Sequence, residues 1–200
     1  MPERCPGPRH RARGLLAALA LAAFLAPAFT PAAASQRMPA SGEVEVAFTP
    51  RDDAEKLLLK VIGSARRSLQ VQAYAFTSRR IADALVAAQA RGVAVEVLAD
   101  AKMNQREKGN ALPRLLAAGV PVALETRYAA AHNKLLIADA DGPHCAVATG
   151  SYNFTWSAQN RNAENVLVLR DNCALAGAYR DNWQRHRAQA TPITRLPWKP

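Results

Sequence analysis

Residues 131–166 read AHNKLLIADADGPHCAVATGSYNFTWSAQNRNAENV, and they hold most of the information on fold and chemistry. Two short apolar runs, Leu135–Ile137 and Ala146–Ala148, flank a turn-like segment at 139–143 that contains Asp, Gly and Pro. This pattern predicts two short strands joined by a turn. A third apolar run, Val166–Leu169, predicts a further strand.

Outside this stretch the chain alternates between strand-like and helix-like segments. Alternating or continuous apolar residues predict strands at 44–48, 68–76, 93–98 and 120–124. Apolar residues at helical spacing predict helices at 52–64, 81–91, 111–118 and 173–187. We therefore expect an α/β fold in a single domain, with a mixed β-sheet flanked by helices on both faces.

The N-terminus resembles an export signal. Four arginines precede the apolar run Leu15–Phe29, and Ala32–Ala34 forms a cleavage-like site before Ser35. We interpret residues 1–34 as a signal peptide, with an uncleaved membrane anchor as the alternative. The apolar run is short and rich in alanine for a membrane span. The protein is thus expected to be periplasmic or secreted, without stable membrane association after cleavage.

Cleavage would leave three segments. Residues 35–42 are polar and contain proline, which indicates a linker. Residues 43–190 are long enough to bury the core of one domain. Residues 191–200 contain Pro192 and Pro197 and are expected to form a loose C-terminal tail.

The chain is strongly basic, with a formal net charge of +10. Residues 1–34 contain four Arg and one Glu, a charge of +3, so the cleaved protein would keep about +7. This excess suits a polyanionic partner, either nucleic acid or an anionic membrane surface.

Two cysteines, Cys145 and Cys173, remain after residues 1–34 are removed. In an oxidising compartment they could form a disulfide. They could equally be two separate buried thiols, because sequence does not show whether their Cα atoms lie close enough.

His132 and Lys134 are separated by one residue at the start of a predicted strand. Residues two apart point to the same face of a strand, so imidazole and ammonium would lie side by side. Asn133 would point the other way. The apolar residues 135–137 would bury the strand and fix this pair at its end.

These side chains suit attack on a phosphodiester. A neutral His132 imidazole can act as nucleophile and form a covalent phosphohistidine. Lys134, the Ser151 hydroxyl and the Asn153 amide can stabilise charge on the phosphate oxygens. Glu164 can accept the proton on the other ring nitrogen and hold the ring. The scheme needs no metal and no cofactor.

The order of these residues resembles a known family. His132, Lys134 and Asp139 in the pattern H-x-K-x-x-x-x-D, followed by Gly150–Thr155, look like the HKD motif of the phospholipase D superfamily. The segments at 72–78 and 162–165 are similar to its small bacterial endonuclease branch, and the likeness extends over roughly residues 44–187.

This resemblance implies roles for the motif residues. His132 would be the nucleophile, with Lys134, Ser151 and Asn153 binding phosphate and Glu164 orienting the nucleophile. Asp139 belongs to the signature, where it supports the site more than it touches substrate.

The family builds one site from two HKD motifs, and this chain has one. The resemblance therefore implies a homodimer with the site on its two-fold axis. In that dimer one His132 can attack while the other protonates the leaving group.

The leading hypothesis is a metal-independent nuclease that cleaves DNA, with RNA left open, and with little sequence preference. Phe76 and Tyr152 could contact substrate or pack in the core. A binding rim is predicted from the basic residues Arg79, Arg80, Lys102, Arg106, Lys108 and Arg127.

Two alternatives remain. A phospholipid phosphodiesterase of the same superfamily would need an apolar face near the site, and the sequence shows none beyond residues 1–34. A non-catalytic nucleic-acid-binding protein would not need intact His132, Lys134, Asn153 and Glu164.

Overall fold

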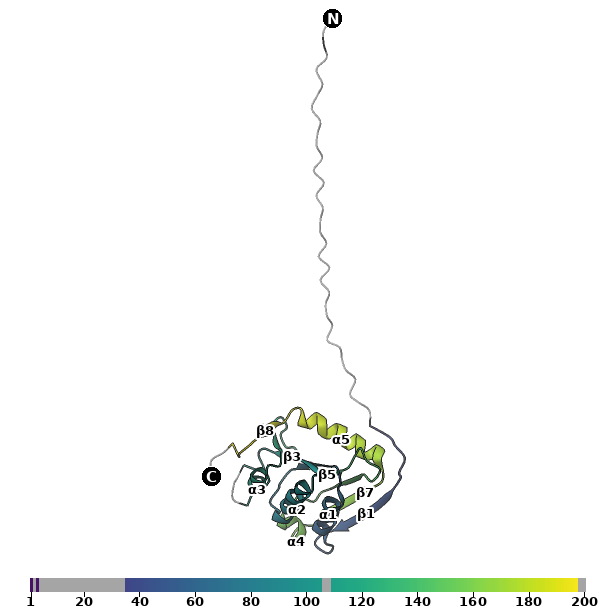
Figure 1. Ribbon diagram of the computed structural model, residues 1–200, viewed down its shortest axis with the longest axis vertical. Coiled ribbons are helices and arrows are strands. Elements are labelled where there is room, and N and C mark those ends of the chain that lie inside the picture. The colour runs from purple at the N-terminus through teal and green to yellow at the C-terminus, as the bar shows by residue number, and fades with distance from the viewer. Residues whose placement is uncertain (2, 4–34, 106–108, 198–200) are drawn as a thin grey trace. The chain divides into compact units, whose positions relative to one another are not determined.

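An eight-stranded mixed sheet forms the framework of the protein (Figure 1). The computed structural model describes residues 1, 3, 35–105 and 109–197. The elements are β1 Glu43–Phe48, α1 Ala54–Ser64, β2 Ser68–Ala73, α2 Arg79–Ala90, β3 Ala94–Asp100, α3 Leu112–Ala117, β4 Val122–Glu125, β5 Lys134–Ala138, β6 Ala146–Gly150, α4 Trp156–Asn160, β7 Asn165–Arg170, α5 Cys173–Arg187 and β8 Thr191–Ile193. The expected signal peptide lies outside the described residues, apart from Met1 and Glu3.

The strand order in the sheet is β1-β7-β6-β5-β2-β3-β4-β8. β2, β3 and β4 run parallel to one another, and the remaining neighbours pair antiparallel. Parallel neighbours need crossover connections, and α2 and α3 supply them. The predicted α/β class with a mixed sheet is confirmed.

Helices cover both faces of the sheet, as expected. On β5, Leu136 packs in the core beneath α1 and α2, whereas Leu135 and Ile137 pack with Ala176 and Trp183 of α5. Figure 1 draws α5 on the opposite side of the sheet from α1 and α2. Because successive residues of β5 are buried on opposite faces, the strand is apolar throughout after Lys134.

The C-terminal end differs from the sequence prediction. Thr191–Ile193, expected in a loose tail, forms strand β8 against β4, with Pro192 opposite Ala123. An edge strand accepts proline because one side of the strand needs no N–H for pairing. The helix α4 was also not predicted, because five residues are too short to show helical periodicity.

The two alternatives for the cysteines are resolved in favour of a disulfide between Cys145 and Cys173, with a Cα–Cα distance of 5.5 Å. It ties the start of β6 to the first residue of α5. Residues 35–42 contain no helix or strand. Within the described residues, no helix is both long and apolar enough to cross a membrane.

Candidate active site

Four strand ends meet at one end of the sheet. β5 runs antiparallel to both β2 and β6, so its first residues lie beside the last residues of those strands. In the register, Lys134 pairs with Ala73 and Gly150 pairs with Val166 of β7. The fold therefore brings the segments around His132, Ser151 and Glu164 to the same end.

His132 and Lys134 are in contact, as their spacing predicted. Lys134 Nζ lies 3.0 Å from His132 Nδ1 and donates to the His132 carbonyl oxygen at 2.8 Å. The lysine is 6% exposed, whereas the histidine is exposed to solvent. A buried ammonium thus lies against an accessible imidazole, so a positive charge and a nucleophile are present at the same place.

Opposing effects act on the charged form of Lys134. Burial lowers the pKa of Lys134 because it removes the charged form from water, and the Glu164 carboxylate acts in the opposite direction. The face of Tyr74 also lies 4.9 Å from Nζ, which favours the cation. The same Tyr74 ring meets His132 edge to face, with ring centroids 4.3 Å apart.

The turn after β6 carries the predicted phosphate-binding residues. A Cβ on Gly150 would lie 2.2 Å from the Asn165 carbonyl oxygen, so only glycine allows the end of β6 to approach β7 this closely. The Ser151 hydroxyl oxygen accepts from the Asn165 backbone N–H at 3.1 Å, and this leaves its O–H able to donate. Asn153 Oδ1 is buried and has no partner among the described residues.

Glu164 lies in this region but does not make the predicted contact. Its carboxylate accepts from Asn162 Nδ2 at 2.9 Å, and its backbone is fixed by two hydrogen bonds to Thr49. None of the hydrogen bonds among the described residues joins Glu164 to His132. Glu164 therefore acts on Lys134 through its charge, and no hydrogen bond or ion pair within the described residues joins a carboxylate to His132.

Asp139 lies at the other end of β5, roughly 20 Å from His132 by the rise of a strand. Its carboxylate accepts from the backbone N–H groups of Arg66, Arg67 and Ser68 at 2.7–2.9 Å. Grouping Asp139 with the catalytic residues is not supported by this position. It fixes the start of β2 to the end of β5.

The two aromatic candidates are both core residues. Phe76 and Tyr152 are buried and belong to the core beneath α1 and α2. Burial raises the pKa of the Tyr152 hydroxyl, and the nearby Glu55 carboxylate acts in the same direction. Neither ring is available to stack on a substrate.

The predicted basic rim is only partly described. Arg79, Lys102 and Arg127 are exposed, and Lys102 Nζ reaches the Ala129 carbonyl oxygen at 3.4 Å. Arg80 pairs with Glu55 at 2.6 Å. Arg106 and Lys108 lie outside the described residues.

Two positioning residues were missed by the sequence analysis. Tyr74 follows the last residue of β2 and packs on both His132 and Lys134. Asp100 is buried at the end of β3, and its Oδ2 accepts from the Ala131 backbone N–H at 2.8 Å. A carboxylate that ends an apolar strand was the available signal for Asp100, because a buried charge needs fixed partners.

Potential metal ligands do not gather at one place in the described part of the chain. It contains no group of three His, Cys, Asp or Glu side chains that could hold a metal ion. The ammonium, hydroxyl and amide groups in this region can each donate a hydrogen bond to an anion.

Comparisons of sequence give consistent matches. A family model described as cardiolipin synthase, PLD-like domain, matches residues 58–187. The chain is 39% identical over 147 residues to a phospholipase D of Rickettsia bellii (strain RML369-C), covering 74% of this chain and 70% of the relative. It is 31% identical over 139 residues to a mitochondrial cardiolipin hydrolase of Xenopus laevis, covering 70% and 63% respectively.

Solved structures match over most of the described chain. The phospholipase D family member Nuc from Salmonella typhimurium aligns with a TM-score of 0.71 and 31% identity, covering 76% of this chain and 99% of that one. NucT from Helicobacter pylori aligns with a TM-score of 0.68 and 24% identity, covering 76% and 100%. The second match supports the fold alone.

Proposed function

Since the chain belongs to the phospholipase D superfamily, and is therefore a phosphodiester hydrolase, we propose that it is a nuclease whose site is shared by two subunits. The resemblance carried by the HKD-like residues is confirmed at the level of the superfamily. The proposed substrate is DNA, with RNA as a second candidate, and cleavage is independent of metal. The observation that carries the proposal is the exposed His132 imidazole against the buried Lys134 ammonium.

The proposed reaction has two steps. A ring nitrogen of His132 attacks phosphorus, and a P–N bond forms as the P–O bond to the leaving sugar oxygen breaks. The partner subunit's His132 gives that oxygen its proton. Water then attacks phosphorus and breaks the P–N bond, while the same partner histidine takes a proton from the water. Lys134 and the donors of Ser151 and Asn153 stabilise the phosphate oxygens in both steps.

The incomplete surroundings of His132 support a shared site. One imidazole cannot be neutral attacker and charged donor in the same step, and the chain contains a single H-x-K. In the single chain His132 is open to solvent, and Asn153 Oδ1 is buried without a partner. The exposed imidazole leaves room for a second histidine, and the Asn153 oxygen is an acceptor that a donor from a second subunit would complete.

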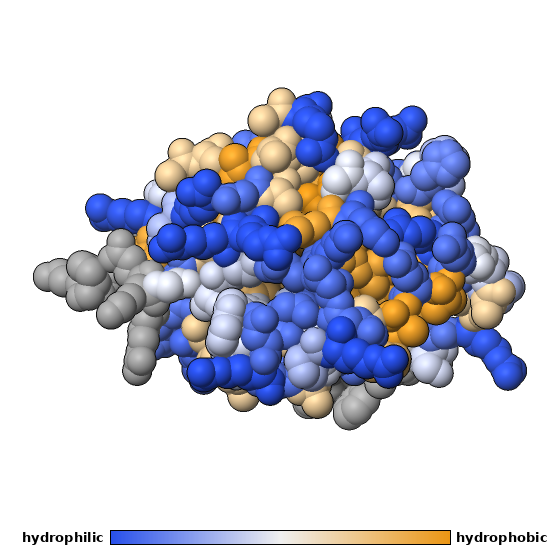
Figure 2. Space-filling view, turned by 90° about the horizontal axis from the view of Figure 1, so that it is seen from below, coloured by the Kyte–Doolittle hydropathy of each residue, from blue (hydrophilic) through white to orange (hydrophobic). Residues whose placement is uncertain are grey.

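An apolar strip on β1 supports a dimer at this end of the sheet. Val44, Val46 and Phe48 are 60%, 49% and 56% exposed, and they share a face because they alternate along the strand. Phe48 pairs with Asn165, which adjoins Glu164. Figure 2 shows an orange area on the right, toward the side where Figure 1 draws β1. Exposed apolar edge strands favour association, and we propose that a second copy covers this one.

Export is also proposed. The Cys145–Cys173 disulfide is the kind of bond that persists in an oxidising compartment. Together with the signal-like sequence at 1–34, it supports a periplasmic or secreted location.

Phospholipid hydrolysis is the second candidate, because the relatives above carry the names phospholipase D and cardiolipin hydrolase. The charge of about +7 that remains without residues 1–34 suits both candidates, because Lys and Arg bind the phosphates of nucleic acids and of anionic membranes alike. Nucleic acid stays the first candidate on the likeness of residues 72–78 and 162–165 to the small bacterial endonuclease branch.

One comparison tests the proposal. Purified protein lacking residues 1–34 is assayed on plasmid DNA, RNA and anionic phospholipid vesicles in excess EDTA. We expect DNA cleavage, and a loss of at least about 1000-fold in His132→Ala. His144→Ala is the matched control, because His144 is an exposed histidine on a turn whose closest charge partner is Asp171 at 3.7 Å. Lipid hydrolysis without DNA cleavage would select the second candidate.

A further inference from the structure

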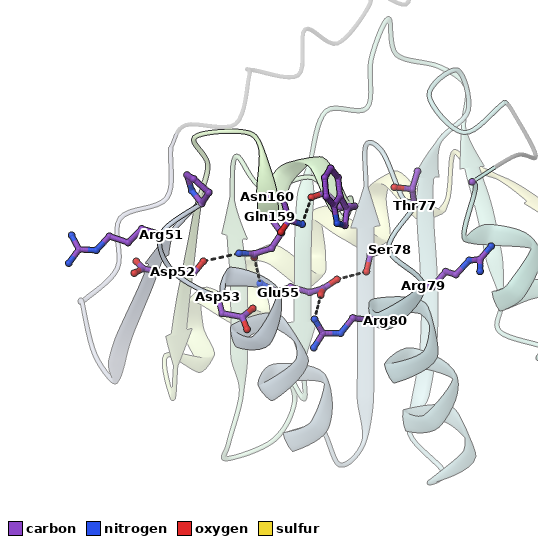
Figure 3. Close-up of a pocket in the computed structure, with 13 residues that line it drawn as sticks. Arg51, Asp52, Asp53, Glu55, Thr77, Ser78, Arg79, Arg80, Gln159 and Asn160 are labelled. Atoms are coloured by element: carbon purple, nitrogen blue, oxygen red, sulfur yellow. Dashed lines mark hydrogen bonds and ion pairs between the residues drawn. The ribbon is translucent and has the colours of Figure 1, made fainter.

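A cavity of about 690 Å³ lies next to the phosphate site and has no part in the reaction above (Figure 3). It opens between α4 and the N-terminal ends of α1 and α2. The Phe154 carbonyl oxygen accepts from the backbone N–H groups of Thr77 and Ser78, both at 2.8 Å, and joins the cavity wall to the turn that carries Asn153. Backbone hydrogen bonds therefore join the wall of the cavity to the turn that carries Asn153.

The charges that line the cavity balance. Its carboxylates already have partners: Asp52 accepts from the Phe48 N–H, Asp53 accepts from the Lys56 N–H, and Glu55 binds Ser78 and Arg80. The three acidic residues are matched by the three arginines Arg51, Arg79 and Arg80.

This balance selects against a phosphate inside the cavity. A site without net positive charge has little attraction for an anionic group, and each lining carboxylate already has a hydrogen-bond partner. Figure 3 shows Arg51 and Arg79 on opposite flanks, both directed away from the centre, where they can meet phosphates outside. A neutral planar group with polar edges fits the interior better.

Trp156 supplies a planar surface at the cavity. It is the first residue of α4 and is 61% exposed, although indole rings are usually buried. The Arg161 guanidinium lies 5.3 Å from the centre of the ring, as in a cation–π pair. The remaining ring surface is available to a ligand.

The helix under Trp156 is held firmly. Thr155 caps α4 by accepting from the Ala158 N–H at 3.1 Å. Gln159 bonds to α1 in both directions, accepting from the Glu55 N–H at 3.0 Å and donating to the Asp52 carbonyl oxygen at 2.9 Å. The indole is therefore presented by a fixed support, which lowers the entropy cost of stacking.

The distance from the catalytic site suits a neighbouring nucleotide. Asn153 and Trp156 are three residues apart, so their Cα atoms are separated by at most about 11 Å. A strand whose phosphate lies at Asn153 would place an adjacent base within reach of the indole.

We propose that this cavity binds a nucleobase flanking the scissile phosphate, stacked on Trp156, and that the enzyme consequently prefers single-stranded nucleic acid. The inference rests on the proposed nuclease function and specifies its substrate. Bases in a duplex are already stacked and paired, so only a single strand offers a base without the cost of unstacking. A lipid chain does not fit, because the lining contains six charged residues and two side-chain amides.

Binding to the uncleaved strand tests the inference without relying on catalysis. In a His132→Ala background, the Kd for a single-stranded oligonucleotide and for the duplex of the same sequence is measured by fluorescence anisotropy. We expect Trp156→Ala to weaken single-strand binding about tenfold and duplex binding less than about twofold. Trp156→Phe should restore most of the affinity, because the ring is kept. Met103→Ala, which removes another exposed apolar side chain outside the cavity, should change neither Kd.

The outcomes separate this inference from the function on which it rests. Unchanged single-strand binding in Trp156→Ala would overturn it, as would an equal loss of affinity for the single strand and the duplex. The inference would also be overturned if Trp156→Ala weakened binding to anionic phospholipid vesicles and left binding to oligonucleotides unchanged. If protein with His132 intact cleaves no nucleic acid but keeps the Trp156-dependent preference for single strands, the nuclease function fails and the base-binding site stands.

Discussion

The two ends of strand β5 carry the two halves of the H-x-K-x-x-x-x-D pattern, and they differ in how their polar groups are satisfied. At the Asp139 end, one carboxylate accepts three backbone N–H groups. At the other end, Lys134 is buried with a lowered pKa and Asn153 Oδ1 has no partner within the described chain. Gln70 Oε1, which lies opposite Ile137 near the Asp139 end, is also buried without a partner within the described chain. The functional end is therefore marked by the exposed His132 imidazole beside the buried Lys134 ammonium.

The Asp139 end also holds the covalent link of the fold. Cys145 lies just before β6 and is bonded to Cys173 at the start of α5. The turn that begins with Asp139 is thus fixed at both of its ends. One short motif therefore contains a catalytic half and a structural half, at opposite ends of a buried strand.

The largest effect is expected at the functional end. Lys134→Met should reduce cleavage by about 100- to 1000-fold, because the charge that stabilises the phosphate oxygens is lost. The melting temperature should be unchanged or higher, since the substitution removes a buried charge. Kinetics and thermal unfolding of the same sample check this. Lys60→Met is the matched control, because Lys60 is exposed and forms a surface ion pair with Glu45.

Removing the disulfide should give the next largest effect, and on stability alone. The bond links positions separated by 28 residues, and closing a loop of that length stabilises a fold by about 3–4 kcal/mol. The double variant Cys145→Ser/Cys173→Ser should lose about this much in chemical denaturation. Its activity per folded molecule should stay within about twofold. A large loss of activity in fully folded protein would mean that the two ends of β5 are coupled.

A smaller loss of stability is expected for Asp139→Asn. Asparagine tolerates the positive φ of 50° at this position but binds backbone N–H groups without the carboxylate charge. The free energy of unfolding should fall by about 2 kcal/mol. Asp141→Asn, an exposed neighbour in the same turn, should change it by less than about 0.5 kcal/mol. Loss of cleavage without loss of stability in Asp139→Asn would place this residue in the catalytic half after all.

The pH dependence should give the smallest and most specific effect. The pKa of Lys134 is lowered by burial, so the cleavage rate should fall with rising pH before the ordinary lysine range is reached. In that window the unfolded chain holds more protons than the folded one, so the free energy of unfolding should rise with pH. Lys134→Arg, though less active, should lose this alkaline decline because its guanidinium stays charged. An identical decline in Lys134→Arg would assign it to another group.

Much of this division could be predicted from sequence. The apolar run at 135–137 predicted β5, and the alternation of side chains in a strand placed His132 and Lys134 on one face. The α/β class followed from the order of strands and helices. The position of Asp139 was also implicit, since the five residues of β5 lie between it and His132.

What sequence could not supply depends on contacts between distant segments. The packing of Tyr74 on His132 requires the pairing of β2 with β5. The hydrogen bond from the Ala131 N–H to Asp100 requires that β3 lie next to β2. The pairing of β8 with β4 overrode the prolines that indicated a loose tail. The contact predicted between Glu164 and His132 is absent from the single chain, and a second subunit is the proposed reason that His132 stays open.

The most direct test of the shared site is the activity of a mixed dimer. Differently tagged subunits, one intact and one His132→Ala, are coexpressed, and the dimer carrying both tags is purified and assayed on DNA. If one histidine attacks while the other donates the proton, the mixed dimer should retain less than about 1% of the intact activity. Retention of about half would mean that each subunit works alone, and would contradict the shared site.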